Sequence, residues 1–475
     1  MSLSSDFSGS LVPEWADVKE LEDKVKASGW KDGRKYGLIE NLFLENFICD
    51  MIFEQKFNEL NKSLLDDLTE AEKREVLDHV KNVLRSAAED LLLDYLRYGV
   101  EYTVKRSEKR TFRLIDFANP QNNSFVYARE IKYPGSPRNV KPDFTLFING
   151  IPIAIIEVKP STRIESEQEA IDQIRRYEQE SPELFRYVQL AIAYGHRKLF
   201  LPTYPNWKRE TRLTPAQPWK IEKQQGEDTI KIESIDYLLQ PTTLLNVIKW
   251  FTFFREKDGS IDKIIGRYNQ YYATEKAVKR ISEYLENEGR GSGLVWHWQG
   301  SGKTYTMFFI ANKYFEEYFE RNPLIFFVVD RIDLQRQLRD FLEGLKAPRF
   351  KSYLKIIGSI EQLKEEIAAI KRSEYKQNIV TRGIYIVLIQ KFQINELESH
   401  LINLALEHLN YINQRNREEY EKIRRELDVL PEDEKKKRLI ELGGIQKREV
   451  LLLIDEAHRS QYGLLASMMK NVFPN

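Results

Sequence analysis

The sequence predicts an α/β protein made of two consecutive domains, and three observations lead to this prediction. Residues 14 to about 100 carry apolar positions at helical spacing, and short β-rich runs follow between residues 111 and 159. From residue 266 onward, apolar runs alternate with helical stretches, which is typical of a parallel sheet wrapped by helices. The first of these later runs leads into a loop of small residues at 300–304, and a helix is expected after that loop.

The composition limits the class of protein. The chain has 475 residues, of which 42% are apolar, so two or three domains with sizeable cores are possible. It contains no apolar run near the ~18 residues that would span a bilayer, and its N-terminus lacks a basic start followed by a hydrophobic stretch. We therefore expect no membrane segment.

The cysteine content and the charge balance bear on the compartment and the partners. The single cysteine, Cys49, cannot form an internal disulfide, which favours a reducing compartment, most simply the cytoplasm. Lys+Arg and Asp+Glu are equal at 73 each, so contact with nucleic acid would need local basic patches. The overall charge neither supports nor excludes a nucleic-acid partner.

The elements of the first domain can be assigned in order. Helices are expected over most of residues 14–100. Turn-forming Asn, Pro and Gly then separate four predicted strands, at residues 111–117, 124–130, 143–148 and 151–159. A charged helix at about 165–180 and a buried strand at 188–194 should follow. Residues 201–235 have little periodicity and are expected to be irregular.

The second domain is expected to begin near residue 266, after an amphipathic linker helix within residues 236–265. Its predicted strands are the apolar runs at residues 293–298, 323–330, 384–389 and 449–455. Residues 402–448 are crowded with Arg, Glu and Lys and contain Pro431, so we expect a solvated helical pair inserted before the last strand.

Asp143, Glu157 and Lys159 are candidates for a site that cuts phosphodiesters. Glu157 and Lys159 stand two apart at the polar end of an apolar strand, so they share one face. Burying such charges costs several kcal/mol per ion, roughly, unless they are paired or bind a metal. Two carboxylates can hold Mg²⁺, which would polarise a phosphate and acidify a water, and Lys159 could orient that water or offset charge. A structural salt bridge at the strand end is the alternative.

Gln173 and Tyr177 follow on the predicted helix. They are four residues apart and so lie on one helical face, where they could brace the site or touch the DNA backbone. A surface glutamine beside a packed tyrosine is the simpler alternative.

The metal site requires a particular strand register. Asn149-Gly150 resembles a two-residue hairpin turn, which would set Asp143 opposite Ile156 and turn Asp143 and Glu157 to opposite faces. A three-residue loop, or one bulged residue, would instead place Asp143 opposite Glu157 on a single face. We therefore predict this one-residue offset.

The loop after the run at 293–298 is suited to binding phosphate. Its residues are Gly300, Ser301, Gly302, Lys303 and Thr304. Glycines allow backbone N–H groups to close around phosphate oxygens, Lys303 can reach the β- and γ-phosphates, and the Thr304 hydroxyl can ligate Mg²⁺. The strict eight-residue P-loop pattern has glycine where this chain has His297, so we interpret the loop as a variant.

The last predicted strand and an earlier glutamine complete the predicted ATP site. The strand delivers Asp455, which can hold Mg²⁺, and next to it Glu456 is the candidate base for the attacking water. Upstream, Gln270 lies among Tyr268, Tyr271 and Tyr272 and could bond to adenine, although packing of a helix would explain it almost as well.

These residues, in this order, resemble the restriction (R) subunit of type I restriction-modification enzymes over about residues 85–475. The stretches that carry the resemblance are LIDFANPQNNSF, PDFTLFINGIPIAIIEVK, EAIDQIRRY, RYNQYYATEKAVKRI, GLVWHWQGSGKTYTM, FVVDRIDLQRQ, LIQKFQ and LLLIDEAHRSQYG. The resemblance implies a PD-(D/E)xK restriction-endonuclease-like domain within residues 1–235, including the helical N-terminal region. It also implies a RecA-like P-loop domain of the superfamily 2 helicase type over residues 266–475.

The resemblance also implies roles for individual residues. Asp143, Glu157 and Lys159 match the nuclease residues, with Gln173 and Tyr177 as the QxxxY pair. In the motor domain, the matches are Lys303, Asp455 and Glu456 for the ATP motifs, Gln270 for adenine sensing, and Asp330-Arg331 with Gln390-Lys391-Phe392 for intermediate motifs. The implied metal ligands are Asp143, Glu157, Thr304 and Asp455.

The resemblance implies ATP and Mg²⁺ as cofactors, double-stranded DNA as substrate, and methylase and specificity subunits as partners. Family members continue through a second RecA-like domain that supplies an arginine to the ATP site, whereas this sequence stops some twenty residues after the acidic DEAH box. We therefore expect a fragment that hydrolyses ATP poorly by itself. The alternatives are a stand-alone nuclease-helicase of DNA repair and a nucleotide-binding scaffold without catalysis.

Overall fold

The computed structural model describes most of the chain as two compact units. The described residues are 14–475 apart from positions 106, 205–214, 226–227, 258, 288–290, 377–380, 456–461 and 475. The units are Met1–Tyr271 and Tyr272–Asn475, and each is described by itself. Among the described helices, none combines the length and the hydropathy that crossing a bilayer would require.

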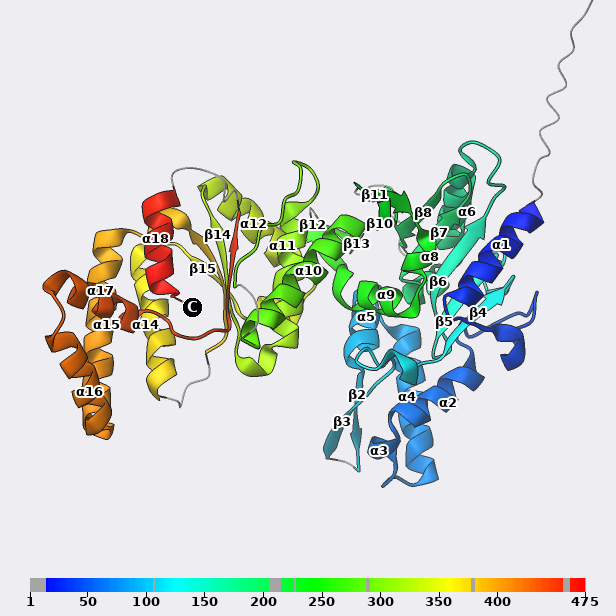
Figure 1. Ribbon diagram of the computed structural model, residues 1–475. Helices are drawn as coiled ribbons and strands as arrows, with labels where there is room; N and C mark the ends of the chain where they lie inside the picture. The colour runs from blue at the N-terminus through cyan, green and yellow to red at the C-terminus, as the bar shows by residue number, and fades with distance from the viewer. Residues whose placement is uncertain are drawn as a thin grey trace, which may run out of the picture. The chain divides into compact units, whose positions relative to one another are not determined.

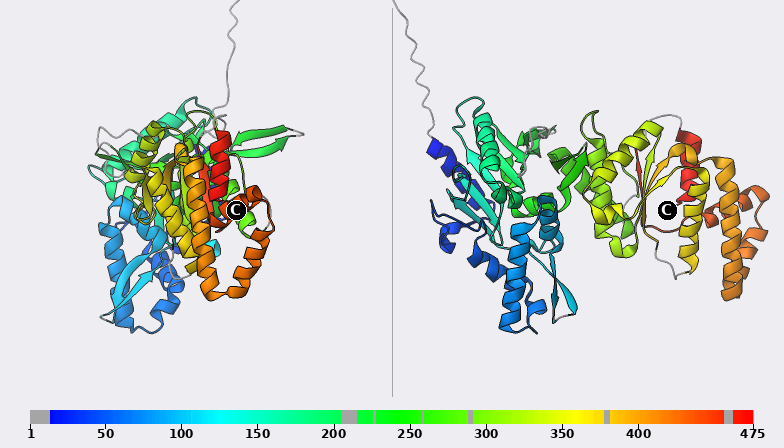
Figure 2. Two further views of the ribbon diagram at one scale, coloured as in Figure 1. Left: turned by 90° about the vertical axis from the view of Figure 1, so that its left-hand side faces the viewer. Right: turned by 180° about the vertical axis from the view of Figure 1, so that it is seen from behind.

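The N-terminal part of the first unit is largely helical, as predicted. Its helices are α1 (Glu14–Ala27), α2 (Asp50–Leu60), α3 (Lys62–Leu65), α4 (Glu70–Ser86) and α5 (Glu89–Tyr98). Helix α4 begins at a capping box, in which Thr69 accepts a bond from the Glu72 N–H and the Glu72 carboxylate accepts one from the Thr69 N–H. The predicted strand at 111–117 is displaced to β3 (Glu108–Phe112), which pairs with β2 (Val100–Val104) beside α4 (Figures 1 and 2).

The centre of the first unit is, in its described part, a seven-stranded sheet in the order β1-β4-β5-β6-β7-β8-β9. The strands are β1 (Lys31–Asp32), β4 (Phe125–Arg129), β5 (Phe144–Ile148), β6 (Ile151–Val158), β7 (Leu190–Tyr194), β8 (Lys198–Pro202) and β9 (Gln217–Pro218). Strands β6 and β7 are parallel and are connected by α6 (Ser166–Glu180) and α7 (Pro182–Tyr187). Both helices pack on one face of the sheet, where Ile155 of β6 meets Ile174 and Leu184.

The end of the first unit differs from the prediction. Residues 201–235, expected to be irregular, include the hairpin β10 (Lys220–Gln225) and β11 (Asp228–Glu233). Residues 236–265, expected as a linker helix, contain α8 (Ile235–Leu238), α9 (Pro241–Asn246), the π-helix η3 (Val247–Phe251) and the hairpin of β12 (Thr252–Lys257) and β13 (Ser260–Ile265). The amphipathic stretch at residues 244–256 is rich in aromatic and β-branched residues, which suit a strand. Periodicity alone does not distinguish a short buried strand from a helix.

The second unit is built around a parallel sheet, as predicted. Within the described residues its strand order is β15-β16-β14-β17. The strands are β14 (Leu324–Val329), β15 (Leu354–Ile357), β16 (Gly383–Leu388) and β17 (Val450–Ile454). Figure 1 shows helices on both faces: α14 (Ile360–Lys376), α15 (Ile394–Arg415) and α18 (Tyr462–Val472) on one, α11 (Lys303–Glu317) and α12 (Ile332–Gly344) on the other. Helix α10 (Tyr268–Leu285) contains the division between the units, and the short α13 (Pro348–Lys351) follows α12.

The predicted strand at residues 293–298 is wrong for this structure. The segment has no regular secondary structure and pairs with no described strand, and Leu294, Trp296 and Trp298 are 75%, 84% and 82% exposed. An apolar run becomes a strand only where a neighbouring edge accepts its backbone hydrogen bonds, and the local pattern does not supply that neighbour.

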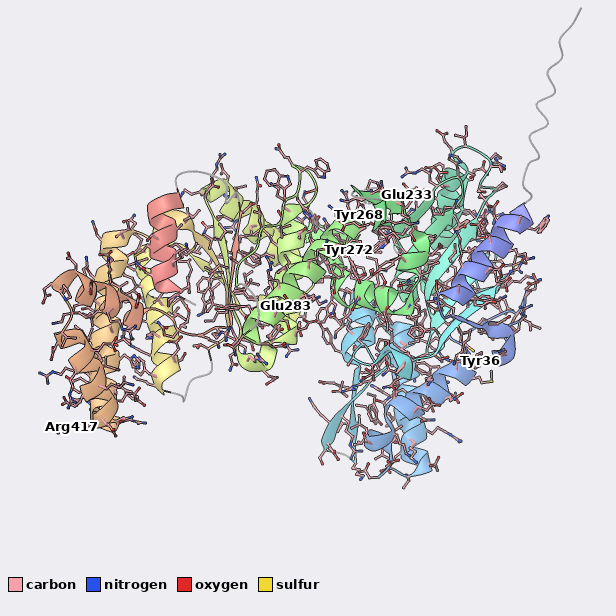
Figure 3. The ribbon with its side chains drawn as sticks, viewed as in Figure 1. Tyr36, Glu233, Tyr268, Tyr272, Glu283 and Arg417 are labelled. Carbon is pink, nitrogen blue, oxygen red and sulfur yellow. The ribbon has the colours of Figure 1, made fainter. Side chains whose placement is uncertain are left out.

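The charged insertion forms three helices rather than the expected pair. Helix α15 begins at Ile394, before the predicted start, and is followed by α16 (Arg417–Asp428) and α17 (Glu432–Gly443). Arg417, labelled in Figure 3, is the first residue of α16 and lies where the chain turns from α15 into α16. Buried Leu401, Leu404 and Ile440 join this insertion to the core beneath the parallel sheet.

Candidate functional site

The hairpin of β5 and β6 sets the geometry of the candidate nuclease site. Ile148 pairs with Ile151, so Asn149 and Gly150 form a two-residue turn, with φ of 51° and 81°. Phe147 then pairs with Pro152, and Leu146 pairs with Ala154. Ile153 is therefore the extra residue of a β-bulge.

The bulge produces the predicted one-residue offset, which is confirmed. Beyond it Phe144 pairs with Ile156, so the next position outward sets Asp143 opposite Glu157. Opposite residues of paired strands share a face, and both carboxylates therefore belong to the face that α6 covers. The turn keeps two residues, so the bulge, and not a three-residue loop, makes the offset.

The turn is held in place by side chains far away in the sequence. The Asn149 side chain accepts a hydrogen bond from the Ser124 N–H at 2.7 Å and donates to the Leu114 carbonyl at 2.9 Å. At Gly150, an added Cβ would lie 2.6 Å from the Cys49 carbonyl oxygen and 2.7 Å from the Phe53 nitrogen. Only glycine fits this close approach, so the end of the hairpin is anchored against the start of α2.

The three nuclease candidates are brought together at the other end of the hairpin. Glu157 is only 1% exposed, and Lys159 Nζ lies 2.9 Å from its Oε1. Asp143 Oδ2 accepts a hydrogen bond of 2.7 Å from the Val158 N–H. The ion pair alone is what a purely structural salt bridge would show. The second carboxylate on the same face is what distinguishes a metal site.

Gln173 and Tyr177 brace this end of the hairpin. Gln173 Nε2 donates to the Tyr177 hydroxyl at 2.6 Å, and that hydroxyl donates to the Lys141 carbonyl at 2.9 Å, two residues before Asp143. Burial raises the pKa of the Tyr177 hydroxyl, and the charges of Glu157 and Asp143 raise it further, so it stays a donor. These contacts favour the bracing role over contact with the DNA backbone.

The donor set suits Mg²⁺ better than a metal bound by protein alone. Within the described residues, no group of three or more His, Cys, Asp or Glu side chains is placed to hold a metal ion. Asp143 and Glu157 offer carboxylate oxygens, and Mg²⁺ is commonly held by one or two carboxylates while it keeps several waters.

The phosphate-binding loop has the backbone that the sequence predicts. Gly300 and Gly302 have φ of 80° and 83°, and Gly302 is the residue from which α11 starts at Lys303. Ser301 Oγ donates to the Trp298 carbonyl at 2.7 Å, which closes the loop. His297, at the position where the strict pattern has glycine, approaches Thr306 Oγ1 at 3.5 Å. The loop thus presents the start of α11, with its N–H groups and partial positive charge.

The ends of three parallel strands meet at one edge of the second sheet. Asp330, Gln390 and Asp455 follow β14, β16 and β17, whose registers are aligned. The Gln390 side chain donates to the Asp330 carbonyl, and the Asp455 N–H donates to the Val328 carbonyl at 3.0 Å. Ligands of open α/β sheets bind at this carboxyl edge. Glu456, the candidate base, lies outside the described residues.

Gln270 belongs to the first unit. It is 5% exposed, and its Oε1 accepts a 2.9 Å hydrogen bond from the Arg267 N–H at the start of α10. The next residue, Tyr271, packs between Trp219 and Phe251, with ring centroids 5.3 and 4.9 Å apart. These contacts agree with the helix-packing alternative, and the adenine role stays a prediction.

Two supporting groups of the candidate nuclease site were missed by sequence reasoning. One is the Lys141 carbonyl that receives the Tyr177 hydroxyl, and the other is the Asn149 side chain at the turn. Asn-Gly announced a turn, but the partners of Asn149 are 25 and 35 residues away and leave no local pattern.

Two family models match the chain. Residues 25–210 match the type I restriction enzyme R protein N terminus, and residues 269–475 match the SWI2/SNF2 ATPase. The first range contains the candidate nuclease residues, and the second contains the phosphate-binding loop and the DEAH box.

Curated relatives agree with the family models. The endonuclease subunit of the putative type I restriction enzyme MjaVIIP from Methanocaldococcus jannaschii is 46% identical over 81% of this chain and 40% of that protein. The endonuclease subunit of the putative type I restriction enzyme MjaVIIIP, from the same organism, is 35% identical over 98% of this chain and 41% of that protein. The endonuclease subunit of the type I restriction enzyme HindI from Haemophilus influenzae is 28% identical over 96% of this chain and 40% of that protein. The chain thus spans about two fifths of the length of these relatives.

Proposed function

Because the chain belongs to the family of type I restriction enzyme R subunits, we propose that it cuts double-stranded DNA in a Mg²⁺-dependent reaction coupled to ATP-driven translocation. In this proposal it acts in the cytoplasm with a methylase and a specificity subunit, and the specificity subunit chooses the DNA target. The first unit carries the cutting site, and the second unit carries the proposed ATP-site residues other than Gln270.

The observation that carries the nuclease half is the bulged register of β5 and β6. It sets Asp143 opposite Glu157 at the end where Lys159 pairs with Glu157. A regular hairpin would have separated the carboxylates onto opposite faces, and no shared ion would be possible. The offset therefore supports a two-carboxylate metal site.

Each residue has a role in this proposal. Asp143 and Glu157 would hold Mg²⁺, which supplies charge to polarise a scissile phosphate and to acidify a water. Lys159, 17% exposed at its side chain, orients the attacking water or offsets charge at the phosphate. Tyr177 and Gln173 keep the start of β5 in place through the Lys141 carbonyl.

The ATP half is supported by the loop before α11. Backbone N–H groups of Gly300, Ser301 and Gly302 would surround phosphate oxygens, and Lys303 would pair with the β- and γ-phosphates. Thr304 and Asp455 would hold Mg²⁺, with Glu456 as the base and Gln270 as the group that senses adenine.

The test compares three variants in the intact enzyme reconstituted with its partner subunits. Asp143→Ala and Lys159→Ala should abolish cleavage while ATP hydrolysis stays near wild type, because they remove only nuclease groups. Lys303→Ala should lose both activities, because cutting depends on translocation. Cleavage by Lys159→Ala, or equal loss of ATP hydrolysis in all three variants, would refute the division of labour.

A further inference from the structure

The loop that follows the nuclease strand keeps a large apolar side chain in solvent. Ile164 is 80% exposed, and it stands five residues after Lys159, between β6 and α6. Single exposed apolar residues are common on protein surfaces, so exposure alone carries little. Ile164 differs from other exposed apolar residues in two ways: its loop is held by hydrogen bonds at both ends, and that loop follows directly after the candidate nuclease residue Lys159.

The loop is anchored from both sides. At its start, the Ser161 N–H donates to buried Asp17 of α1 at 3.0 Å, and the Ser161 carbonyl lies 3.1 Å from His196 Nδ1. At its end, Ser166 Oγ accepts from the His196 N–H at 2.8 Å. The loop is thus fastened to α1 and to the turn after β7, and Ile164 is held outward by a fixed backbone.

The backbone next to Ile164 adopts a conformation that costs energy. Glu165 has φ of 61° and ψ of 15°, the left-handed region that disfavours residues other than glycine and asparagine. Such conformations persist where the surroundings impose them, and they gather at functional sites. Here the turn at Glu165 lets α6 begin at Ser166 while Ile164 stays outside the core.

Resting on the proposed function, we infer that Ile164 is a wedge that enters the minor groove of the DNA beside the cutting site. Two neighbouring cations can contact a phosphate backbone: Arg163 and Arg197 have side chains 50% and 47% exposed. Their ion pairs with Glu169 and Glu233 lie at the surface, where such pairs contribute little and can be exchanged for phosphates. The exposed carboxylates of Glu165 and Glu169 also flank Ile164, so the apolar side chain, and not a net positive charge, carries the contact. Apolar wedges of this kind partly unstack a base step and bend the duplex.

The inference predicts where the enzyme cuts as well as how fast. Pyrimidine–purine steps such as TA and CA unstack most easily, so wild-type cuts should be enriched at those steps. In the reconstituted enzyme, Ile164→Ser should slow single-turnover cleavage about tenfold or more, because the apolar contact with DNA is lost. It should also remove the enrichment, whereas Ile164→Met should retain both the rate and the enrichment.

Control variants separate a wedge from a general surface effect and from a protein contact. Ile39→Ser, at another isoleucine that is 55% exposed, should behave as wild type, and thermal unfolding of Ile164→Ser should be unchanged because this side chain packs on little. An unchanged rate and cut distribution in Ile164→Ser would overturn the wedge. So would a loss of ATP hydrolysis or of bound partner subunits, which would identify the loop as a protein contact. Lys159→Ala, measured in parallel, tests the proposed function independently of Ile164.

Discussion

Lys263 is fully buried, and its replacement by methionine tests how much burying this charged group lowers the free energy of unfolding of the first unit. Its Nζ donates to the Val188 carbonyl at 3.2 Å and to Thr203 Oγ1 at 3.1 Å, and it lies 5.4 Å from the centre of the Phe254 ring. Neither hydrogen-bond acceptor carries a charge. Methionine has a similar length and no charge, so Lys263→Met removes the ammonium without opening a large cavity.

The magnitude follows from the pKa of Lys263. Burial lowers this pKa from 10.5 to about 7, although Glu89 and Glu178 oppose the shift and Arg97 adds to it. A lowering of about 3.5 pH units, at about 1.4 kcal/mol per unit, is a cost of about 5 kcal/mol when the lysine is charged in both states. The lost hydrogen bonds offset roughly 1–2 kcal/mol, and the Val188 carbonyl still accepts from Thr203 Oγ1 at 2.5 Å.

The sign of the pH dependence can be worked out from the two pKa values. Between about pH 7 and pH 10.5 the unfolded chain binds a proton at Lys263 that the folded chain lacks, so wild-type stability from this group rises with pH. Below about pH 7 both states are charged and the whole cost is present. Lys263→Met should therefore be more stable than wild type by about 3 kcal/mol at pH 7, and its advantage should disappear by about pH 10.

Urea unfolding of the two proteins between pH 6 and pH 10 measures this difference. Lys257→Met, at an exposed lysine of the same hairpin, controls for the loss of a lysine in general. A stability difference between Lys263→Met and wild type that is constant over this range would refute the reasoning, because the lysine would then have the same pKa in both states.

Two further predictions concern local backbone structure, and urea unfolding of the first unit measures both. Gly150→Ala should cost about 2–4 kcal/mol, because it adds a clash with backbone atoms to the strain of a positive φ. Gly259→Ala, at φ of 75° with open space around it, should cost only about 1 kcal/mol, and equal costs would contradict the close approach at Gly150. Thr69→Ala should cost about 1 kcal/mol by removing the side-chain half of the capping box; no loss would mean that the start of α4 is held by packing alone.

The sequence correctly predicted those elements whose pairing partners lie close to them in the chain. Strands β5 and β6 are adjacent in the chain, are apolar apart from Thr145 and Glu157, and are joined by Asn-Gly, so local information determined both the strands and the turn. The one-residue offset was predicted from chemistry, since two carboxylates that share an ion must share a face. The position of the bulged residue, Ile153, left no signal that we could identify.

The elements that were missed depend on partners distant in the sequence. Residues 293–298 have the composition of a strand, but a strand needs an edge to pair with, and the described sheet does not include them. Residues 252–265 form a hairpin because its buried residues, including Phe253 and Ile265, meet the core of the first unit. In both segments, apolar character alone did not determine the conformation.

The bulge at Ile153 makes the candidate nuclease site more sensitive to the number of residues in the hairpin than to which apolar residues they are. The hairpin is tied at the turn by Asn149 and at the open end by the bond from the Val158 N–H to Asp143, so an inserted or deleted residue cannot slide out at either end. Exchanges of one apolar residue for another along β6 preserve the count and hence the face of Glu157. In this hairpin, apolar substitutions therefore leave the strand register unchanged, and each side chain stays on the same face of the sheet, whereas an insertion or deletion would move Glu157 to the opposite face.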